Sequence, residues 1–255
     1  MTPSRNILIY ETPEQVAQAA AESFVRDVQT AVTANGRFSV ALSGGNTPKR
    51  VYALLATEDF AKRIEWDKVH IFFGDERSVP PDHPDSNYRM VLESLISRVS
   101  IPADNVHRIV GEGDAVENAR LYEDLLKTFF AGQPWPRFDL VLLGMGDDGH
   151  TASLFPYTSA VKEKEAWVVA NWVSQMATWR ISLTAPASNH ARHIMFLVTG
   201  PSKAERVAEV FRATNDWERL PARLINPVAG ILEWLLDKDA ASRLNLEAAK
   251  RLATD

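Results

Sequence analysis

The chain has 255 residues, of which 45% are hydrophobic and 24% are charged, and its formal net charge is −5. This apolar content is enough for a large folded core, and the negative charge gives no sign of a nucleic-acid-binding protein. The chain has no cysteine, which excludes disulfide bonds, zinc–thiolate sites, iron–sulfur clusters and thiol nucleophiles.

Strand-like and helix-like segments alternate along the first part of the chain. Residues 6–10 form a short apolar run typical of a strand, and residues 13–34 carry apolar side chains at the spacing of an amphipathic helix. A second strand is expected over 37–42, and the helix that follows it is expected to have Thr47 as its N-cap. Residues 68–74 then have the continuous apolar character of a buried strand.

The same alternation continues to the C-terminal region. The expected elements are a helix over 87–98 capped by Ser86, a helix over 114–130, a strand over 138–144, a strand pair over 165–171 and 178–184, a strand over 193–200 and a helix over 201–212. Residues 230–237 fit a strand or a helix equally well. Continuous apolar strands separated by helices predict an α/β fold with a mostly parallel sheet, and no linker-like tract divides the chain. We therefore expect a single domain over residues 1–255.

The chain has no segment that suggests export or membrane insertion. Its N-terminal apolar run is too short for a signal peptide, and no segment approaches the roughly 18 apolar residues that span a bilayer. We expect a cytoplasmic protein with no nucleic-acid or membrane partner. The oligomeric state stays open between a monomer and a weak homodimer.

Polar, glycine-rich turns follow four of the expected strands. These turns are SGGNTP (43–48), GDER (74–77), GMGDDGH (144–150) and TGPSKAE (199–205). Ligands of open α/β sheets bind at the carboxyl ends of the strands, so we expect the four turns to meet at one edge of the sheet.

The first of these turns has the composition of a phosphate-binding loop. Gly44 and Gly45 let backbone N–H groups approach a ligand closely, while Ser43, Asn46 and Thr47 add side-chain donors beside a helix N-terminus. The spacing of a Walker loop is absent. A plain glycine turn with a threonine cap would explain the same residues.

Two other turns add cations to this edge. Lys203 lies in the expected first turn of a helix, where it opposes the helix dipole, and an anion bound beside it would explain its position. Arg77 follows Asp75 and Glu76, one of which could orient its guanidinium toward a phosphate or a carboxylate. A solvated lysine and a surface salt-bridge cluster are the structural alternatives.

The turn GMGDDGH places a titratable ring on flexible backbone. Asp148 lies two residues before His150 and could hold its ring or a bound water. A histidine held in this way is a plausible general base. A histidine that only hydrogen-bonds its own turn is the alternative.

Several well-known site motifs are absent from the sequence. It has no GxSxG elbow, no HExxH or other paired metal-ligand spacing, and no GxGxxG motif that opens a helix in a first βαβ unit. We therefore expect no serine nucleophile, no metal site and no dinucleotide or other cofactor.

Four motifs together resemble those of the 6-phosphogluconolactonase family. They are SGGNTP, FFGDERSVPPDHPDSNYRM, DLVLLGMGDDGHTASLFP and VTGPSKAERV, which occur in the family's order over about residues 42–207, and LPARLINP (220–227) extends the match. Glucosamine-6-phosphate deaminase, in the same superfamily, is similar in its SGG turn, its DE pair, its DGH turn and its lysine. The resemblance implies a Rossmann-like α/β/α three-layer fold with a mostly parallel central sheet.

The resemblance also implies an activity and roles for the site residues. The activity is the hydrolysis of 6-phospho-D-glucono-1,5-lactone, a phosphorylated sugar lactone, to 6-phosphogluconate in the oxidative pentose phosphate pathway. His150 would be the acid/base, Arg77 and Lys203 would be the phosphate ligands, and the turn 43–47 would lie beside the substrate.

Two positions separate this chain from its relatives. The deaminase pattern has a glutamate five residues after the DGH histidine, and this chain has Phe155 there, which favours the lactonase. Asp147 occupies a position often held by proline in the family, and we expect no consequence beyond a less rigid turn. The alternatives are a deaminase-like isomerase that uses Asp75 as a base on C2, and a non-catalytic sugar-phosphate-binding regulator.

Lactone hydrolysis needs an activated water, a stabilised oxyanion and a protonated leaving oxygen. In our hypothesis, neutral His150 takes a proton from the water that attacks C1 and then protonates the ring oxygen. Asp148 orients the imidazole, and backbone N–H groups of a glycine turn hold the oxyanion. Arg77 and Lys203 hold the phosphate away from the reacting carbon, and Arg180, on an expected strand, is a further candidate for a substrate contact.

Overall fold

The central sheet of the protein is parallel throughout. It consists of β1 (Ser4–Tyr10), β2 (Phe38–Leu42), β3 (Val69–Phe73), β5 (Leu140–Leu143), β8 (His193–Val198) and β9 (Ile231–Asp237). Their order in the sheet is β1-β9-β8-β5-β2-β3. The protein is described by a computed structural model over residues 4–212 and 216–245. The mostly parallel sheet expected from the sequence is thus confirmed.

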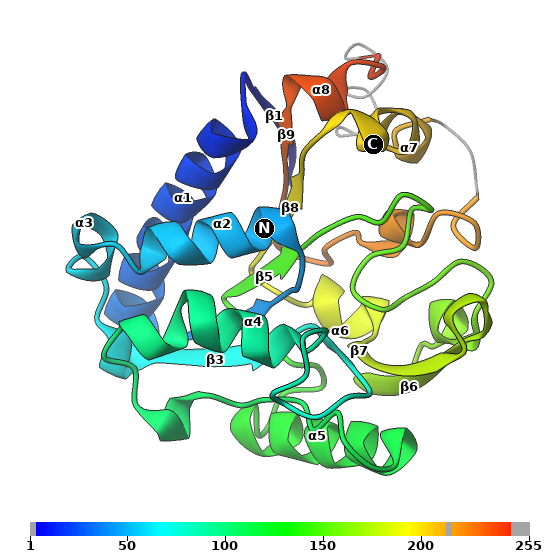
Figure 1. The fold of residues 1–255 in the computed structure, drawn as a ribbon. Coiled ribbons are helices and arrows are strands. Elements are labelled where there is room, and N and C mark those ends of the chain that lie inside the picture. The colour runs from blue at the N-terminus through cyan, green and yellow to red at the C-terminus, as the bar shows by residue number, and fades with distance from the viewer. Residues whose placement is uncertain (1–3, 213–215, 246–255) are drawn as a thin grey trace.

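Helices cover both faces of this sheet (Figure 1). The α-helices of the described residues are α1 (Pro13–Asn35), α2 (Asn46–Leu55), α3 (Glu58–Ala61), α4 (Asn87–Ser94), α5 (Ala115–Phe129), α6 (Ala185–Asn189), α7 (Ala204–Val210) and α8 (Lys238–Ala241). The 3-10 helices of these residues are Trp66–Lys68, Ile96–Arg98, Ala103–Asn105, Ser159–Lys162, Ser174–Met176, Pro201–Lys203 and Pro221–Leu224. In Figure 1, α1, α2 and α4 lie on one side of the sheet, and α5, α6 and α7 lie on the other. The result is a three-layer α/β/α architecture.

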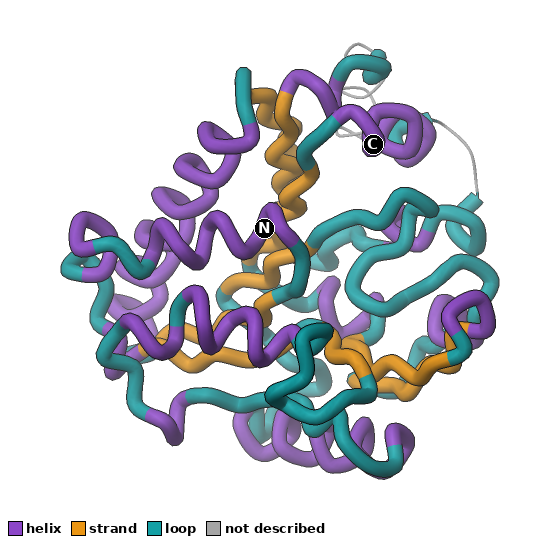
Figure 2. Tube along the Cα trace, viewed as in Figure 1, coloured by secondary structure: helices purple, strands orange, loops and turns teal. Residues whose placement is uncertain are grey.

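A second, smaller sheet is antiparallel. It consists of β4 (Asp75–Arg77), β6 (Val168–Val173) and β7 (Thr178–Leu183), in the order β4-β7-β6. Only Gly74 separates β3 from β4, so the chain passes directly from one sheet into the other. Figure 2 shows the small sheet at the lower right, beside the central sheet. The expected strand pair over 165–171 and 178–184 is confirmed as β6 and β7.

Three buried strands form the middle of the core. Every residue of β2, β5 and β8 is buried, as their continuous apolar sequences predict. Most of the buried apolar side chains between Val16 and Ala240 belong to one cluster.

Helix α1 shows how local sequence sets the ends of an element. The side-chain oxygen of Thr12 accepts a hydrogen bond from the backbone N–H of Gln15, and Pro13 begins the helix. The helix ends at Gly36, whose φ of 72° is in the left-handed region that favours glycine. The apolar stripe of α1 faces the sheet, and its other face is polar.

No helix within the described residues is long and apolar enough to cross a membrane.

Element boundaries differ from the sequence prediction most clearly in three places. Helix α2 begins at Asn46 with Gly45 as its N-cap, so the prediction that Thr47 caps it is wrong. The Thr47 hydroxyl instead lies 2.8 Å from the Thr199 hydroxyl, on the turn after β8. Helix α4 ends at Ser94, and a 3-10 turn follows it.

The third difference concerns the segment 201–212, expected to be one helix. It begins as a 3-10 turn after Gly200 and continues as α7, so Lys203 precedes the first turn of the α-helix. Residues 230–237, which periodicity left undecided, contain strand β9, which pairs in parallel with both β1 and β8.

A buried charge cluster lies at the amino-terminal end of β8. The Nδ1 of His193 is 2.8 Å from the Asp27 carboxylate on α1, and its Nε2 is 3.4 Å from the Glu233 carboxylate on β9. Burial alone would lower the pKa of His193, but the two carboxylates outweigh burial and raise the pKa to about 9. The histidine is therefore a cation that joins α1 to the sheet at neutral pH.

This cluster predicts a pH-dependent stability. A raised histidine pKa stabilises the folded chain fully below the unfolded-state value of about 6.5, and this stabilisation is lost as the pH rises through about 9. Urea unfolding of the wild type should show a falling midpoint from neutral pH to about pH 10, and His193→Gln should show a flatter profile. His83→Gln, in an exposed loop, is the control and should retain the wild-type slope. Equal slopes for wild type and His193→Gln would contradict the assignment.

Candidate active site

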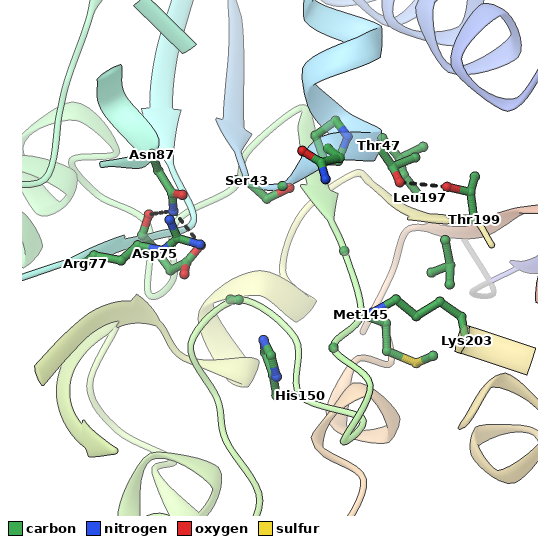
Figure 3. Close-up of a pocket in the computed structure, with 18 residues that line it drawn as sticks. Ser43, Thr47, Asp75, Arg77, Asn87, Met145, His150, Leu197, Thr199 and Lys203 are labelled. Atoms are coloured by element: carbon green, nitrogen blue, oxygen red, sulfur yellow. Dashed lines mark hydrogen bonds between the residues drawn. The ribbon is translucent and has the colours of Figure 1, made fainter. Parts of the chain in front are cut away.

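The four turns singled out in the sequence meet at one cavity. A cavity of about 450 Å³ opens at the carboxyl ends of the central strands (Figure 3). Its lining includes Ser43, Gly44, Gly45, Asn46, Thr47, Asp75, Arg77, Gly144, Gly146, His150, Thr199 and Lys203. An adjoining cavity of about 380 Å³ shares Asp75, Arg77 and His150, and adds Asp148 and Arg180. The expected convergence at one sheet edge is confirmed.

A buried tyrosine holds the turn after β2 in place through hydrogen bonds to its backbone. The Tyr52 hydroxyl donates to the carbonyl of Ser43 at 2.8 Å and accepts from the Ser43 N–H at 3.1 Å. The Ser43 hydroxyl is buried at the cavity and has no hydrogen-bond partner in the part of the chain that the structure describes. Within the same residues, the N–H groups of Gly44 and Gly45 also donate to no protein acceptor. The turn therefore presents several unused donors to a ligand.

Asn87 is a site residue that the sequence analysis did not identify. It is buried at the start of α4, and its Nδ2 donates to the carbonyl of Asp75 at 2.9 Å and lies 3.3 Å from the Asp75 carboxylate. The other oxygen of that carboxylate accepts from the Ser153 hydroxyl at 2.7 Å. A Cβ on Gly44 would lie 1.9 Å from the Asn87 Oδ1, so only glycine allows this contact. The one sequence signal was an asparagine directly after the Ser86 cap.

The acidic pair before Arg77 does not orient its guanidinium, which corrects the expectation from the sequence. Glu76 instead accepts from the backbone N–H groups of Arg77, Asn87 and Tyr88, each at 2.8 Å. Burial raises the pKa of Glu76, and these main-chain donors oppose that rise. The Arg77 guanidinium donates to the carbonyl of Asp85. Glu76 thus organises the backbone around Arg77.

The turn that carries His150 depends on a second close approach to glycine. The N–H of Gly146 donates to the carbonyl of His150 at 2.8 Å, which closes the turn. A Cβ on Gly146 would lie 2.1 Å from the Nδ1 of His150 and 2.7 Å from the Asp148 carboxylate. The glycine therefore makes room for the imidazole and its acidic partner to pack over the backbone.

Asp148 holds the imidazole in one tautomer. Its Oδ1 lies 2.6 Å from the Nδ1 of His150 and accepts from the His150 N–H at 3.0 Å. Burial raises the pKa of Asp148, but the hydrogen bonds and charge of His150, together with backbone donors, outweigh burial, and the pKa is below its ordinary value. Because an ionised carboxylate only accepts, Nδ1 carries the proton, and Nε2 of the neutral ring has a free lone pair. Phe155 stacks on the ring, with 4.1 Å between the ring centroids.

Lys203 lines the cavity, and its ammonium forms an ion pair with a carboxylate of the same chain. Its ammonium lies 2.6 Å from the carboxylate of Asp147, on the turn that holds His150. The ion pair lowers the pKa of Asp147. The expectation that Asp147 has no consequence beyond a less rigid turn is therefore wrong. The contact was not visible in the sequence because it joins two separate strand ends.

Arg180 lies directly opposite Arg77 in the register of β4 and β7. Like charges opposite one another destabilise a strand pair, and burial and Arg77 both lower the pKa of Arg180. Its guanidinium lies 3.7 Å from the Met176 sulfur, and no carboxylate of the described residues pairs with it. An anion between the two guanidinium groups would relieve this repulsion.

The described residues contain no group of three or more His, Asp or Glu side chains that could hold a metal ion.

Known proteins with similar sequences and structures share one family. A family model described as glucosamine-6-phosphate isomerases/6-phosphogluconolactonase matches residues 11–234. The 6-phosphogluconolactonase of Nostoc sp. is 42% identical over 240 residues, which covers 92% of this chain and 97% of the relative. That of Mycobacterium tuberculosis is 37% identical over 253 residues, which covers 94% and 99%.

Solved structures that resemble this chain include a protein of the same family and a deaminase with the same fold. The 6-phosphogluconolactonase from Trypanosoma cruzi has a TM-score of 0.86 at 32% identity and covers 96% of this chain and 98% of its own. A monomeric glucosamine-6-phosphate deaminase has a TM-score of 0.79 at 20% identity, over 93% and 99% of the two chains. The second match shows the fold alone and confirms the expected likeness to the deaminase fold.

The contact between Gly44 and Asn87 predicts a position-specific cost. Gly44→Ala should force Asn87 away from Asp75 and lower the free energy of unfolding by about 1–3 kcal/mol, as overpacking does. Gly144→Ala is the matched control in the same cavity, because a Cβ there meets nothing within 4 Å. Thermal or urea unfolding measures both, and equal stability of the two variants would contradict the packing described here.

Proposed function

The chain belongs to the glucosamine-6-phosphate isomerase/6-phosphogluconolactonase family, and we propose that it hydrolyses 6-phospho-D-glucono-1,5-lactone to 6-phosphogluconate with His150 as the general base. This reaction belongs to the oxidative pentose phosphate pathway. The relatives described above carry the lactonase activity in their names. The observation that supports the role of His150 most strongly is its imidazole, which Asp148 holds through Nδ1 and which lines both cavities.

The first step is attack of water on the lactone carbonyl. The Nε2 lone pair of His150 takes a proton from a water molecule as its oxygen bonds to C1. The imidazolium that forms is stabilised by the Asp148 carboxylate at 2.6 Å. The imidazolium then passes its proton to the ring oxygen as the bond between C1 and that oxygen breaks, and the new C1 carboxylic acid loses its remaining proton to solvent to give 6-phosphogluconate. No covalent enzyme intermediate is needed.

The turn after β2 supplies the donors that this reaction needs. As C1 becomes tetrahedral, its carbonyl oxygen gains negative charge, and preorganised N–H groups stabilise such an oxyanion by about 3 kcal/mol each. Gly44 and Gly45 offer such N–H groups, and the buried Ser43 hydroxyl has no other partner among the described residues. Asn46 and Thr47 complete this wall of the cavity. We assign the turn to the substrate's carbonyl and hydroxyl oxygens.

Cations on both sides of the imidazole account for recognition of the phosphate. In Figure 3, Arg77 and Lys203 approach the cavity from opposite sides of His150. We propose that both are phosphate ligands and that the Arg77 side chain, held by the Asp85 carbonyl, moves inward on binding. Arg180, paired against Arg77, adds to the positive potential. The phosphate then fixes C1 against the imidazole without taking part in the reaction.

The deaminase alternative needs an acid that this site does not have. A base on C2 could be Asp75, whose carboxylate is held by Ser153 and Asn87 at the cavity. Phe155 stands where the deaminase has its glutamate, and its ring stacks on the His150 imidazole. A non-catalytic regulator is disfavoured by the ordered Asp148–His150 pair, which phosphate binding alone would not require.

The proposal extends to the setting in which the enzyme works. We propose that it acts on its small-molecule substrate in the cytoplasm, without a cofactor, as a monomer or a weak homodimer. A rice relative is named as chloroplastic, so the location differs among relatives.

The role of His150 is tested by substitution. His150→Ala should lower kcat by roughly 10²–10⁴-fold, because general base catalysis is lost. The assay uses freshly made lactone in a pH-stat and is corrected for spontaneous opening. His83→Ala, at an exposed loop position, should keep the wild-type rate. If His150→Ala turned over at the wild-type rate, another group would be the base.

The phosphate role of Lys203 has a different kinetic signature. Lys203→Ala should mainly raise KM, because the contact is the same in the ground state and the transition state. Lys238→Ala is the control, since that lysine forms an exposed ion pair with Glu11. An unchanged KM in Lys203→Ala would place the phosphate site elsewhere.

A further inference from the structure

We propose that Asp147 is a built-in competitor for the substrate phosphate, because its carboxylate occupies Lys203 in the ligand-free protein and must leave when a phosphate binds. This inference rests on the proposed function in one respect, which is the assignment of Lys203 as a phosphate ligand. It adds a residue that weakens binding, where the residues assigned above strengthen it.

The carboxylate of Asp147 pairs with the ammonium group that the proposed function assigns to the substrate phosphate. Its Oδ1 lies 2.6 Å from the Lys203 ammonium and accepts from the Ser202 hydroxyl at 3.4 Å. The lysine and the serine belong to the same 3-10 turn after β8. A phosphate bound at the ammonium would draw on the same positive charge and, at Ser202, on the same hydroxyl, so the two anions compete.

The surroundings allow the aspartate to leave while the lysine stays. The Asp147 side chain is 71% exposed, whereas the Lys203 side chain is only 22% exposed. The carbonyl of Asp147 accepts from the Arg206 Nε at 2.9 Å, which holds the main chain of the turn in place. A rotation of the side chain into solvent is therefore enough, and the turn that carries His150 does not have to move.

The two anions differ in strength, which makes the exchange selective. A phosphate monoester carries close to two negative charges at neutral pH and three acceptor oxygens, whereas the carboxylate of Asp147 carries one charge. A sugar lactone without phosphate has no charge with which to displace the carboxylate. Asp147 therefore favours phosphorylated ligands, and it speeds release of the product by returning to Lys203.

Binding measurements test this inference without relying on turnover. We expect Asp147→Asn to bind 6-phosphogluconate and inorganic phosphate more tightly, by roughly two- to five-fold, the range of an exposed ion pair. KM for the lactone should fall by a similar factor. Titration calorimetry measures the dissociation constants, and thermal unfolding checks that the variant is folded.

A matched control separates occupancy of Lys203 from a general change in charge. Glu205→Gln removes one negative charge two residues from Lys203, but Glu205 pairs with Arg243 at 3.6 Å. The Glu205→Gln variant should bind 6-phosphogluconate and inorganic phosphate with dissociation constants in the wild-type range. If Glu205→Gln tightened binding as much as Asp147→Asn, or if Asp147→Asn bound phosphate equally or more weakly, the inference would be overturned.

A double variant identifies the cation through which Asp147 acts. In a Lys203→Met background, Asp147→Asn should leave both dissociation constants unchanged, because the contested site is gone. A persisting gain in affinity would refute competition at Lys203. Should the wild type fail to open the lactone while Asp147→Asn still binds phosphate more tightly, the proposed function would fail and this inference would stand.

Discussion

Parallel pairing of the central strands is the constraint on which the site depends. Because β2, β5 and β8 run in the same direction, the turns that follow them meet at one edge of the sheet. The strands are buried along their whole length, so they fix the turns firmly. The small antiparallel sheet then brings Arg77 and Arg180 to the same edge from the side.

Buried polar groups beneath the turns order this edge of the sheet for the proposed reaction. Tyr52 holds Ser43, Glu76 caps the backbone beside Arg77, and Asp148 fixes the ring of His150. In each case a buried or half-buried polar group satisfies backbone or ring donors and leaves another donor or lone pair facing the cavity. Preorganisation of this kind stabilises charge that develops during a reaction, because the dipoles are already in place.

The sequence predicts the features that depend on local pattern. Apolar runs predicted the parallel sheet, and the glycine turns predicted the His150 site and its Asp148 partner. The predictions that were wrong concern residues whose contacts lie on distant segments of the chain. Thr47 contacts Thr199 instead of capping its helix, and Asp147 meets Lys203 across two strand ends. Such contacts follow from strand order, which a single sequence does not encode in its periodicity.

In the proposed reaction, one imidazole faces the acyl carbon while cations hold the phosphate. A crystal structure of the protein with bound 6-phosphogluconate is the decisive test of this arrangement. We expect the product carboxylate within hydrogen-bond distance of the His150 Nε2, with the phosphate on Lys203 and Asp147 turned away. A carboxylate bound away from the imidazole, or a phosphate bound away from Lys203, would contradict it.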